Sequence, residues 1–182
     1  MLYIMRHGIT DWNKIHRLQG RTDVPLSEEG RQMAKDAAVQ YKDVHFDICY
    51  SSPLSRAKET ASLVLAGRNI PIITDDRLVE MGFGKFEGFS QILDRTDLPI
   101  YKLFTEPENF VATDGVEPLS ELFARTGDFL RTVIQKDLDN NKDVLIVGHG
   151  AMNHSIICQL KNLPLSQFWE TRLNNCELIK LL

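Results

Sequence analysis

The chain has 182 residues, of which 43% are hydrophobic and 25% are charged, a balance typical of a globular protein with one substantial core. The formal net charge of −4 gives no general attraction to nucleic acid or to an anionic membrane, so neither is an expected partner. No apolar run approaches the roughly 20 residues of a membrane span, and no basic, cleavable leader precedes the first apolar run, so we expect no secretory signal.

The three cysteines, Cys49, Cys158 and Cys176, are far apart and form no C-x-x-C pair. This pattern indicates neither a disulfide framework nor a zinc knuckle. We therefore expect reduced, mostly buried thiols and a cytoplasmic protein.

A strand is expected at residues 2–5, directly before Arg6-His7-Gly8, and a similar one at residues 144–147, directly before Gly148-His149-Gly150. Both apolar runs are rich in β-forming residues and suit strands buried on both faces of a parallel sheet. Ligands of open α/β sheets bind just beyond the carboxyl ends of such strands. The two histidines are therefore expected to meet in one crevice, where His7 is the candidate nucleophile.

Between these two strands, the next expected elements are a helix capped by Ser27 and a strand at residues 46–50. Ser52 is expected to cap a second helix, with Pro53 in its first position. This register puts Arg56 in the opening turn of that helix, just beyond the end of a strand. The position makes Arg56 a better phosphate candidate than most other arginines.

A third short strand is expected at residues 71–74, and a strongly periodic helix at residues 119–138. A helix at about residues 151–160 and an edge strand at residues 176–182 complete the pattern. The segment at about residues 85–115 is weakly helical and interrupted by glycine and proline, and we expect a small cap there.

The alternation of strands and helices predicts a three-layer α/β/α fold with a mostly parallel sheet, formed by residues 1–182 as a single domain with this cap as its insertion.

Phosphoryl transfer needs charge cancellation on the phosphoryl oxygens and a nucleophile in line with the leaving group. Arg6 and Arg56 supply planar, permanently charged forks for phosphate oxygens, and His149 can donate one more hydrogen bond. His7 can attack as a neutral imidazole, and one carboxylic acid can protonate the leaving alkoxide and later activate water.

The chain also resembles a known family through a set of short motifs that keep their order along the sequence. Taken together they look like the signature of the histidine phosphatase superfamily, in its phosphoglycerate mutase-like branch. The matching stretches are Arg6-His7-Gly8 with Thr10, Trp12 and Asn13, Gln19-Gly20, Pro25-Leu26-Ser27 with Gly30, Ser51 to Ala57, Leu78-Val79-Glu80, Phe83-Gly84 with Glu87-Gly88, and Gly148-His149-Gly150.

The resemblance implies a role for each matching position. His7 becomes the phosphorylated nucleophile, with Arg6, Arg56 and His149 around the phosphate. Glu80 matches the proton donor and is preferred over Glu87, whose motif position is usually structural in this family. The resemblance also implies Asn13, Gln19, Gly20 and Gly150 as phosphate- or substrate-binding residues. No cofactor and no metal are implied.

The expected function is a phosphatase that hydrolyses small phosphorylated metabolites through a phosphohistidine. The alternative is a phosphoglycerate mutase that returns the phosphoryl group to a second substrate hydroxyl. The short 85–115 segment has only Lys85, Arg95 and Lys102 as cations, which favours water as the acceptor. A non-catalytic phosphate-binding domain is a third reading, and the sequence leaves open whether the chain forms a homodimer.

A zinc site on His7, His149 and a carboxylate is disfavoured, because Arg6 would lie beside the metal.

Overall fold

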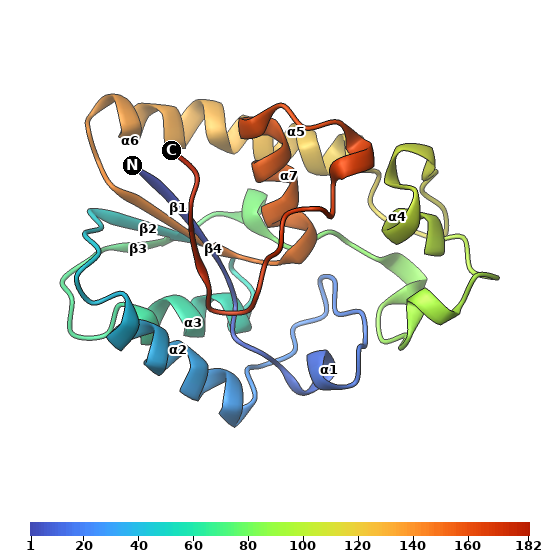
Figure 1. Cartoon of the computed structure of the whole chain (residues 1–182), viewed down its shortest axis with the longest axis horizontal. Coiled ribbons are helices and arrows are strands. Elements are labelled where there is room, and N and C mark those ends of the chain that lie inside the picture. Colours follow the sequence, from blue (N-terminus) through green and yellow to red (C-terminus); the bar gives the residue numbers. More distant parts are fainter.

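A computed structural model describes all 182 residues and has a five-stranded sheet at its centre, in the order β3-β2-β4-β1-β5 (Figure 1). The pairs β3–β2, β2–β4 and β4–β1 are parallel, and β5 runs antiparallel to β1 at the edge. The mostly parallel sheet and the terminal edge strand are thus confirmed. The strands are β1 (Leu2–Arg6), β2 (Ile48–Ser51), β3 (Ile72–Thr74), β4 (Val144–Gly148) and β5 (Leu178–Lys180).

Helices follow most of the strands, as the alternating pattern predicts. They are α1 (Asp11–Lys14), α2 (Glu28–Gln40), α3 (Ser55–Val64), α4 (Tyr101–Thr105), α5 (Leu119–Phe129), α6 (Gln135–Asp139) and α7 (Gly150–Lys161). Short 3-10 turns occur at Asp76–Leu78, Gly84–Phe86, Ile92–Asp94, Pro107–Asn109 and Leu165–Gln167. The helix expected at residues 119–138 is interrupted by a π-helical turn at Leu130–Ile134 between α5 and α6.

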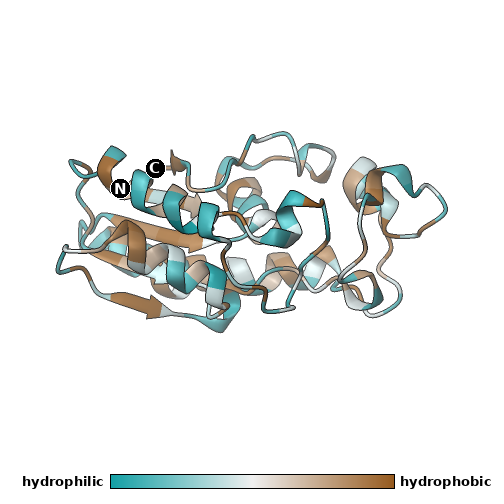
Figure 2. Cartoon of the chain, turned by 90° about the horizontal axis from the view of Figure 1, so that it is seen from below, coloured by the Kyte–Doolittle hydropathy of each residue, from teal (hydrophilic) through white to brown (hydrophobic).

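Alternate residues of the strands face two separate hydrophobic cores. In β1, Leu2 and Ile4 pack with α5 and α7, whereas Tyr3 and Met5 pack with α2 and α3. Figure 1 shows these helix pairs on opposite sides of the sheet, and Figure 2 shows hydrophobic strands between helices with banded polar surfaces. The three-layer α/β/α fold is confirmed.

The start of α3 differs from the sequence prediction. Ser52 does not cap it, and Pro53 is not helical: the helix begins at Ser55, after Leu54. Asp23, from a distant loop, accepts hydrogen bonds from the Ser55 amide (2.8 Å) and hydroxyl (2.7 Å) and so supplies the missing cap. Arg56 still lies in the first turn of α3, as predicted.

Residues between the first 3-10 turn and α5 leave the sheet and form a lobe at one end of the molecule, around α4 (Figures 1 and 2). The lobe is tied to the body by stacking of Phe104 on Trp169, with ring centroids 5.3 Å apart. None of the helices has the length and apolar character needed to cross a bilayer.

Candidate active site

His7 follows β1 and is almost completely buried, with 3% of its surface exposed. Its Nδ1 lies 2.6 Å from the carbonyl oxygen of Gly8, an acceptor only, so Nδ1 carries the proton and Nε2 keeps a free lone pair. The backbone around it is fixed as well, because Asn175 Nδ2 donates to the His7 carbonyl (2.6 Å) and Thr60 Oγ1 accepts from the Gly8 amide (3.0 Å). Burial, then the charges of Arg56 and Arg6, hold the pKa of His7 well below its usual value. His7 is therefore a neutral imidazole with an oriented Nε2.

Gly8 is needed for close packing against a helix. A Cβ atom there would lie 2.5 Å from the carbonyl oxygen of Gly30 in α2. This contact is the physical reason for glycine at the position.

His149, between β4 and α7, is completely buried next to His7, with ring centroids 5.2 Å apart. Its Nε2 lies 2.7 Å from Ser52 Oγ, which also accepts from the Leu54 amide (3.3 Å). The Ser52 proton is then free to donate to Nε2, which leaves the imidazole proton of neutral His149 on Nδ1. That Nδ1 is buried without a partner, and burial, followed by the charge of Arg56, lowers the pKa of His149 well below its usual value.

Two arginines place positive charge beside His7, one of them buried and the other half-buried. Arg56 is 1% exposed, and its Nη atoms donate to the carbonyl oxygens of Gly20 (2.7 Å) and Thr22 (2.9 Å). Arg6 donates through Nη1 to Leu173 O (3.3 Å). The Nε atoms of both arginines are buried with no partner. Unpaired charged donors in a buried site are costly, so this arrangement favours a bound anion.

Glu80 faces the same space from the other side. Its Oε1 accepts from the amides of Met81 (2.8 Å) and Met152 (2.9 Å), and its Oε2 from the amide of Ala151 (3.2 Å). The carboxylate is thereby fixed at the first turn of α7.

Glu87, the alternative acid, has a different environment. It accepts from the amides of Arg21, Thr22 and Phe83 and from the Thr22 hydroxyl. Gly20, with φ of +53°, packs directly on it, since a Cβ there would lie 2.2 Å from Glu87 Oε1. Glu87 thus organises the loop whose carbonyl groups hold Arg56, and it does not line the cavity described next.

A cavity of about 130 Å³ brings most of the predicted residues together. Its lining includes Arg6, His7, Asn13, Gln19, Gly20, Arg56, Glu80 and Gly150. His149 is not in the lining, although its ring lies directly beside that of His7. Asn13 accepts from the Thr10 amide through Oδ1 (2.9 Å) in a capping box, and Gln19 accepts from the Thr10 hydroxyl through Oε1 (2.9 Å). Both side chains therefore keep amide hydrogens for a ligand.

The sequence interpretation missed a buried ion pair behind Glu80. Arg125 of α5 forms a fork with Glu117, through Nε to Oε1 (2.7 Å) and Nη2 to Oε2 (3.0 Å), and its Nη1 also donates to the Val79 carbonyl (2.8 Å). Glu117 accepts from the Gly82 amide (3.2 Å) and pairs with Arg21 (3.1 Å). The pair thus fixes the backbone on both sides of Glu80. The backbone groups that this pair binds, at Val79 and Gly82, are distant from it in sequence. The only indication in the sequence itself was an acid next to Pro118, just before a periodic helix.

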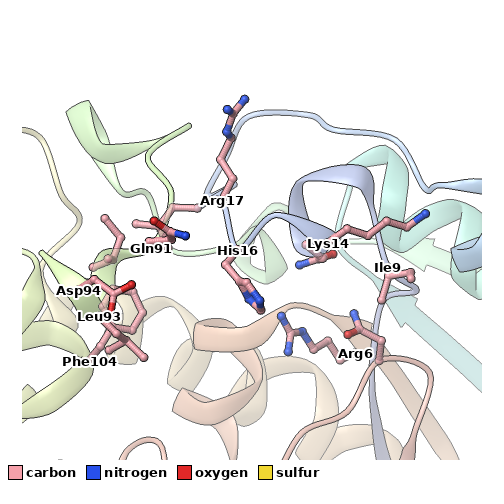
Figure 3. A pocket seen from close by; sticks show the side chains of 13 residues that line it. Arg6, Ile9, Lys14, His16, Arg17, Gln91, Leu93, Asp94 and Phe104 are labelled. Carbon is pink, nitrogen blue, oxygen red and sulfur yellow. The ribbon is translucent and has the colours of Figure 1, made fainter.

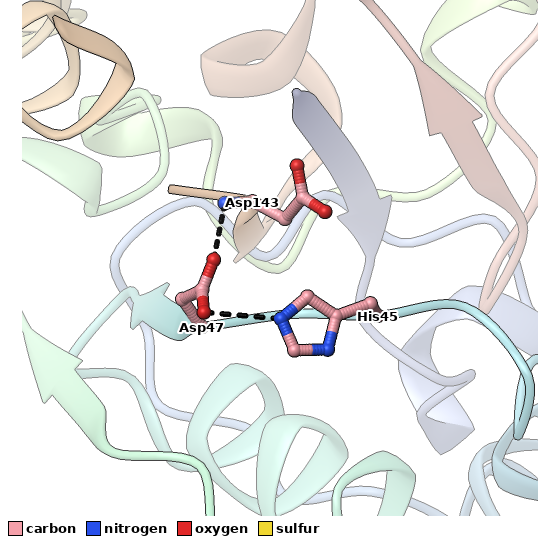
Figure 4. Close-up of side chains that lie close together, drawn as sticks. All are labelled: His45, Asp47 and Asp143. Atoms are coloured by element: carbon pink, nitrogen blue, oxygen red, sulfur yellow. Dashed lines mark hydrogen bonds and ion pairs between the residues drawn. The ribbon is translucent and has the colours of Figure 1, made fainter. Parts of the chain in front are cut away.

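One group of side chains has the spacing for a metal ion, but it lies elsewhere. The ligand atoms of His45, Asp47 and Asp143 all lie within 4.8 Å of one another (Figure 4). Asp47 already bonds to His45 Nε2 (3.0 Å) and to the Asp143 amide (2.7 Å), and Asp143 pairs with the N-terminal ammonium (2.8 Å). These bonds tie the starts of the strands together, and the ammonium charge disfavours a cation.

The buried histidines make stability depend on pH. In the unfolded chain His7 and His149 bind protons below about pH 6.5, whereas in the folded state both stay neutral to lower pH. The unfolded state therefore binds more protons in this window, and the free energy of unfolding falls as the pH is lowered, by about 1.4 kcal/mol per pH unit for each group. Urea unfolding between about pH 5 and 7 measures this slope. His149→Asn should reduce this slope by the contribution of one histidine. An unchanged slope would contradict the conclusion that His149 stays neutral in the folded state.

Comparison with known proteins agrees with this geometry. The family model of the histidine phosphatase superfamily (branch 1) matches residues 2–182. Phosphoserine phosphatase 1 of Hydrogenobacter thermophilus is 31% identical over 176 residues, covering 96% of this chain and 82% of that protein. A protein of Escherichia coli named "Probable phosphoglycerate mutase GpmB" is 29% identical over 188 residues, covering 99% of this chain and 83% of its own. The solved structure of Bacillus stearothermophilus YhfR superposes with a TM-score of 0.87 at 32% identity, covering 97% of this chain and 88% of that one. The chain therefore belongs to the histidine phosphatase superfamily, branch 1.

Proposed function

We propose that this protein is a phosphatase that hydrolyses small phosphomonoesters through a phosphohistidine on His7. The observation that carries the proposal is the oriented, neutral Nε2 of His7 beside two arginines whose Nε donors are buried and unpaired. A phosphate dianion satisfies those donors and brings its phosphorus to the nucleophile.

The reaction then takes two steps. His7 Nε2 attacks phosphorus, the bond from phosphorus to the ester oxygen breaks, and the protonated carboxyl group of Glu80 gives its proton to the leaving alkoxide. Water next attacks phosphorus, the bond from phosphorus to His7 Nε2 breaks, the carboxylate of Glu80 takes the water proton, and inorganic phosphate leaves. Arg6 and Arg56 stabilise the charge in both steps, and the Nδ1 proton of His149 is the further donor that we assign to a phosphate oxygen.

The charges of the lobe support water rather than a second substrate hydroxyl as the acceptor. Lys85 is paired with Asp114 (2.7 Å) and Arg95 with Asp97 (3.0 Å), both at the surface. Of the three cations in the lobe, only Lys102 forms no ion pair, so a single free cation is left there for the second anionic group of a mutase substrate.

Purified protein is expected to release inorganic phosphate from phosphomonoesters, and EDTA should leave the rate unchanged because the arginines supply the positive charge. Release of phosphate and conversion of 3-phosphoglycerate to 2-phosphoglycerate are measured in parallel. Isomerisation faster than phosphate release would favour the mutase. Tight binding of phosphate without turnover would favour a non-catalytic binding domain.

Glu117→Gln is expected to lower kcat by about 10- to 100-fold, because a misplaced proton donor loses much of its effect. The inhibition constant for inorganic phosphate should change less than about threefold, since the arginine donors stay in place. Glu121→Gln, an exposed change in the first turn of α5 shortly after Glu117, is the matched control. An equal loss of kcat and of phosphate affinity would show that the ion pair supports the whole fold rather than Glu80.

We also propose a cytoplasmic location. All three cysteines are free and buried, and burial raises the pKa of Cys49 and of Cys176 to about 12, so their thiols stay protonated and unreactive. Free thiols are typical of a reducing compartment.

A further inference from the structure

Arg6 depends on a single carbonyl group for the direction of its guanidinium. The only hydrogen bond that its side chain forms within the chain runs from Nη1 to the Leu173 carbonyl (3.3 Å), and its Nε has no partner. Arg6 lines the cavity around His7 and also a larger, adjoining cavity, into which Figure 3 shows its guanidinium extending. The position of the Leu173 carbonyl therefore decides where this charge lies relative to a bound phosphate.

That carbonyl belongs to the segment 171–175, which follows the last 3-10 turn and lies against the end of β1. The same segment holds His7, because Asn175 Nδ2 donates to the His7 carbonyl (2.6 Å). No amide of residues 171–175 donates to a backbone carbonyl, although the Cys176 amide anchors the far end by donating to the Arg6 carbonyl (2.8 Å). Side chains of other elements must therefore fix the segment, and through it Arg6 and His7.

The start of the segment is held by a buried histidine of α7. Both ring nitrogens of His154 face carbonyl oxygens: Nδ1 lies 2.7 Å from that of Gly150, and Nε2 lies 2.9 Å from that of Thr171. The rings of Phe168 and Trp169 pack on it, with centroids 5.8 Å and 4.9 Å from its own. Because Thr171 is the first residue of the segment, Nε2 links the segment to the first turn of α7.

A neutral imidazole cannot satisfy both of these contacts. A carbonyl oxygen only accepts hydrogen bonds, so each contact needs a proton on the facing nitrogen, and an imidazole carries two such protons only when it is charged. With one proton left, the shorter contact to Gly150, within the same helix, keeps it. The lone pairs of Nε2 and of the Thr171 oxygen then face each other. The bond to the segment therefore exists only in the imidazolium form.

The surroundings of His154 set the pH at which this bond forms. Burial is the largest effect and lowers the pKa of His154, whereas the bonds to the Gly150 and Thr171 carbonyls raise it. Of the charged groups that act on it, Glu80 raises this pKa and Arg6 lowers it. The second proton therefore binds below about pH 6.5. The bond to Thr171 forms as the pH falls and is lost as the pH rises.

We propose that His154 is a positioning residue whose second proton fastens the segment 171–175 to α7 and thereby holds Arg6 and His7 in place for the reaction. The inference rests on the proposed phosphatase function, in which these two residues bind and attack the phosphoryl group. In the imidazolium form the Leu173 carbonyl keeps Arg6 directed at the phosphate. In the neutral form the contact with Thr171 is repulsive, the segment shifts, and Arg6 loses its one fixed partner.

Two amide variants imitate the two ring nitrogens at every pH. In His154→Gln the amide nitrogen takes the place of Nε2 and donates to the Thr171 carbonyl, whereas in His154→Asn it takes the place of Nδ1 and reaches only the Gly150 carbonyl. For both variants and the wild type, kcat/KM for p-nitrophenyl phosphate and the dissociation constant of inorganic phosphate are measured from about pH 5 to about pH 8. Ratios between the proteins cancel the titration of phosphate and of Glu80, which all three share.

The wild type should match His154→Gln at about pH 5 and His154→Asn at about pH 8. The ratio of kcat/KM between the wild type and His154→Asn should fall by about tenfold over this range, as expected for the loss of one hydrogen bond with a charged donor. Affinity for inorganic phosphate should fall with it, because Arg6 contacts the phosphate. His45→Asn, at an exposed histidine, is the control, and its ratio to the wild type should not change with pH.

Ratios that stay constant with pH would overturn the proposal, because His154 would then act through packing alone. If a variant fails to fold, nitrogen NMR of the wild type still decides: His154 must gain its second ring proton over the pH range in which phosphate affinity rises relative to the His45 control, and a ring that gains none there contradicts the proposal. If no protein releases phosphate from the ester, the proposed function fails, while the phosphate affinities still test the role of His154.

Discussion

Replacing His7 by asparagine is expected to lower turnover of phosphomonoesters by more than about 10⁴-fold, because loss of a covalent nucleophile removes the reaction path itself. Asparagine keeps a polar side chain in the buried position but has no basic nitrogen to attack phosphorus. Arg6 and Arg56 are untouched, so the variant should still bind inorganic phosphate, and titration calorimetry can measure this.

His45→Asn is the matched control for the His7 variant. His45 is an exposed histidine bonded to Asp47, in the cluster of Figure 4, and its loss should leave turnover unchanged. Retention of turnover within about tenfold by the His7 variant would contradict a nucleophilic role, since no second nucleophile would account for so small a loss.

Glu80→Gln is expected to lower kcat by about 10²- to 10⁴-fold for alkyl phosphates, because the alkoxide then leaves without a proton. With p-nitrophenyl phosphate the leaving group needs no proton, so phosphorylation of His7 should remain fast. Hydrolysis of the phosphohistidine still lacks its base and becomes slow. A burst of nitrophenolate, about one per active site, should therefore precede a slow steady state, as rapid-mixing absorbance measures.

Glu87→Gln separates the two acids that the sequence left in competition. Glu87 bonds to the backbone of the loop that carries Arg56's partners, so its loss should weaken substrate binding and stability without producing a burst. A burst in the Glu87 variant, or normal turnover of alkyl phosphates by the Glu80 variant, would reverse the assignment of the proton donor.

The sequence predicted those parts of the site that depend on strand ends. His7 and His149 follow neighbouring parallel strands. To predict that they lie close together required only the two apolar runs and the rule that sites form at the carboxyl ends of parallel strands. Arg56 was placed correctly in the first turn of α3, although the expected cap was wrong. Ser52 bonds to His149 instead of capping α3, and Asp23 caps the helix in its place. The bond from Asp23 to the helix start joins segments that are distant in sequence, so local helix signals cannot predict it.

The features that sequence reasoning missed depend on contacts between segments that are far apart in the sequence. The Glu117–Arg125 pair lies in the part of the chain that matches no family motif. Its role is recognised only from its hydrogen bonds to the backbone around Glu80. A cavity of about 820 Å³ that adjoins the one around His7 forms because the loop after α1 lies against the lobe, where the Leu18 amide donates to the Phe89 carbonyl (2.9 Å). Neither arrangement follows from periodicity or capping.

The central claim, a phosphoryl group carried by His7, is tested most directly by locating the phosphoryl group in the trapped intermediate. The Glu80→Gln variant is mixed with a phosphomonoester labelled in the phosphoryl group, denatured in alkali, in which phosphohistidine persists, and digested for peptide mapping. We predict label on the peptide that contains His7, attached through Nε2 because Nδ1 is bonded to the Gly8 carbonyl. Label on another residue, or a full burst of product from a protein that carries no label, would contradict the account.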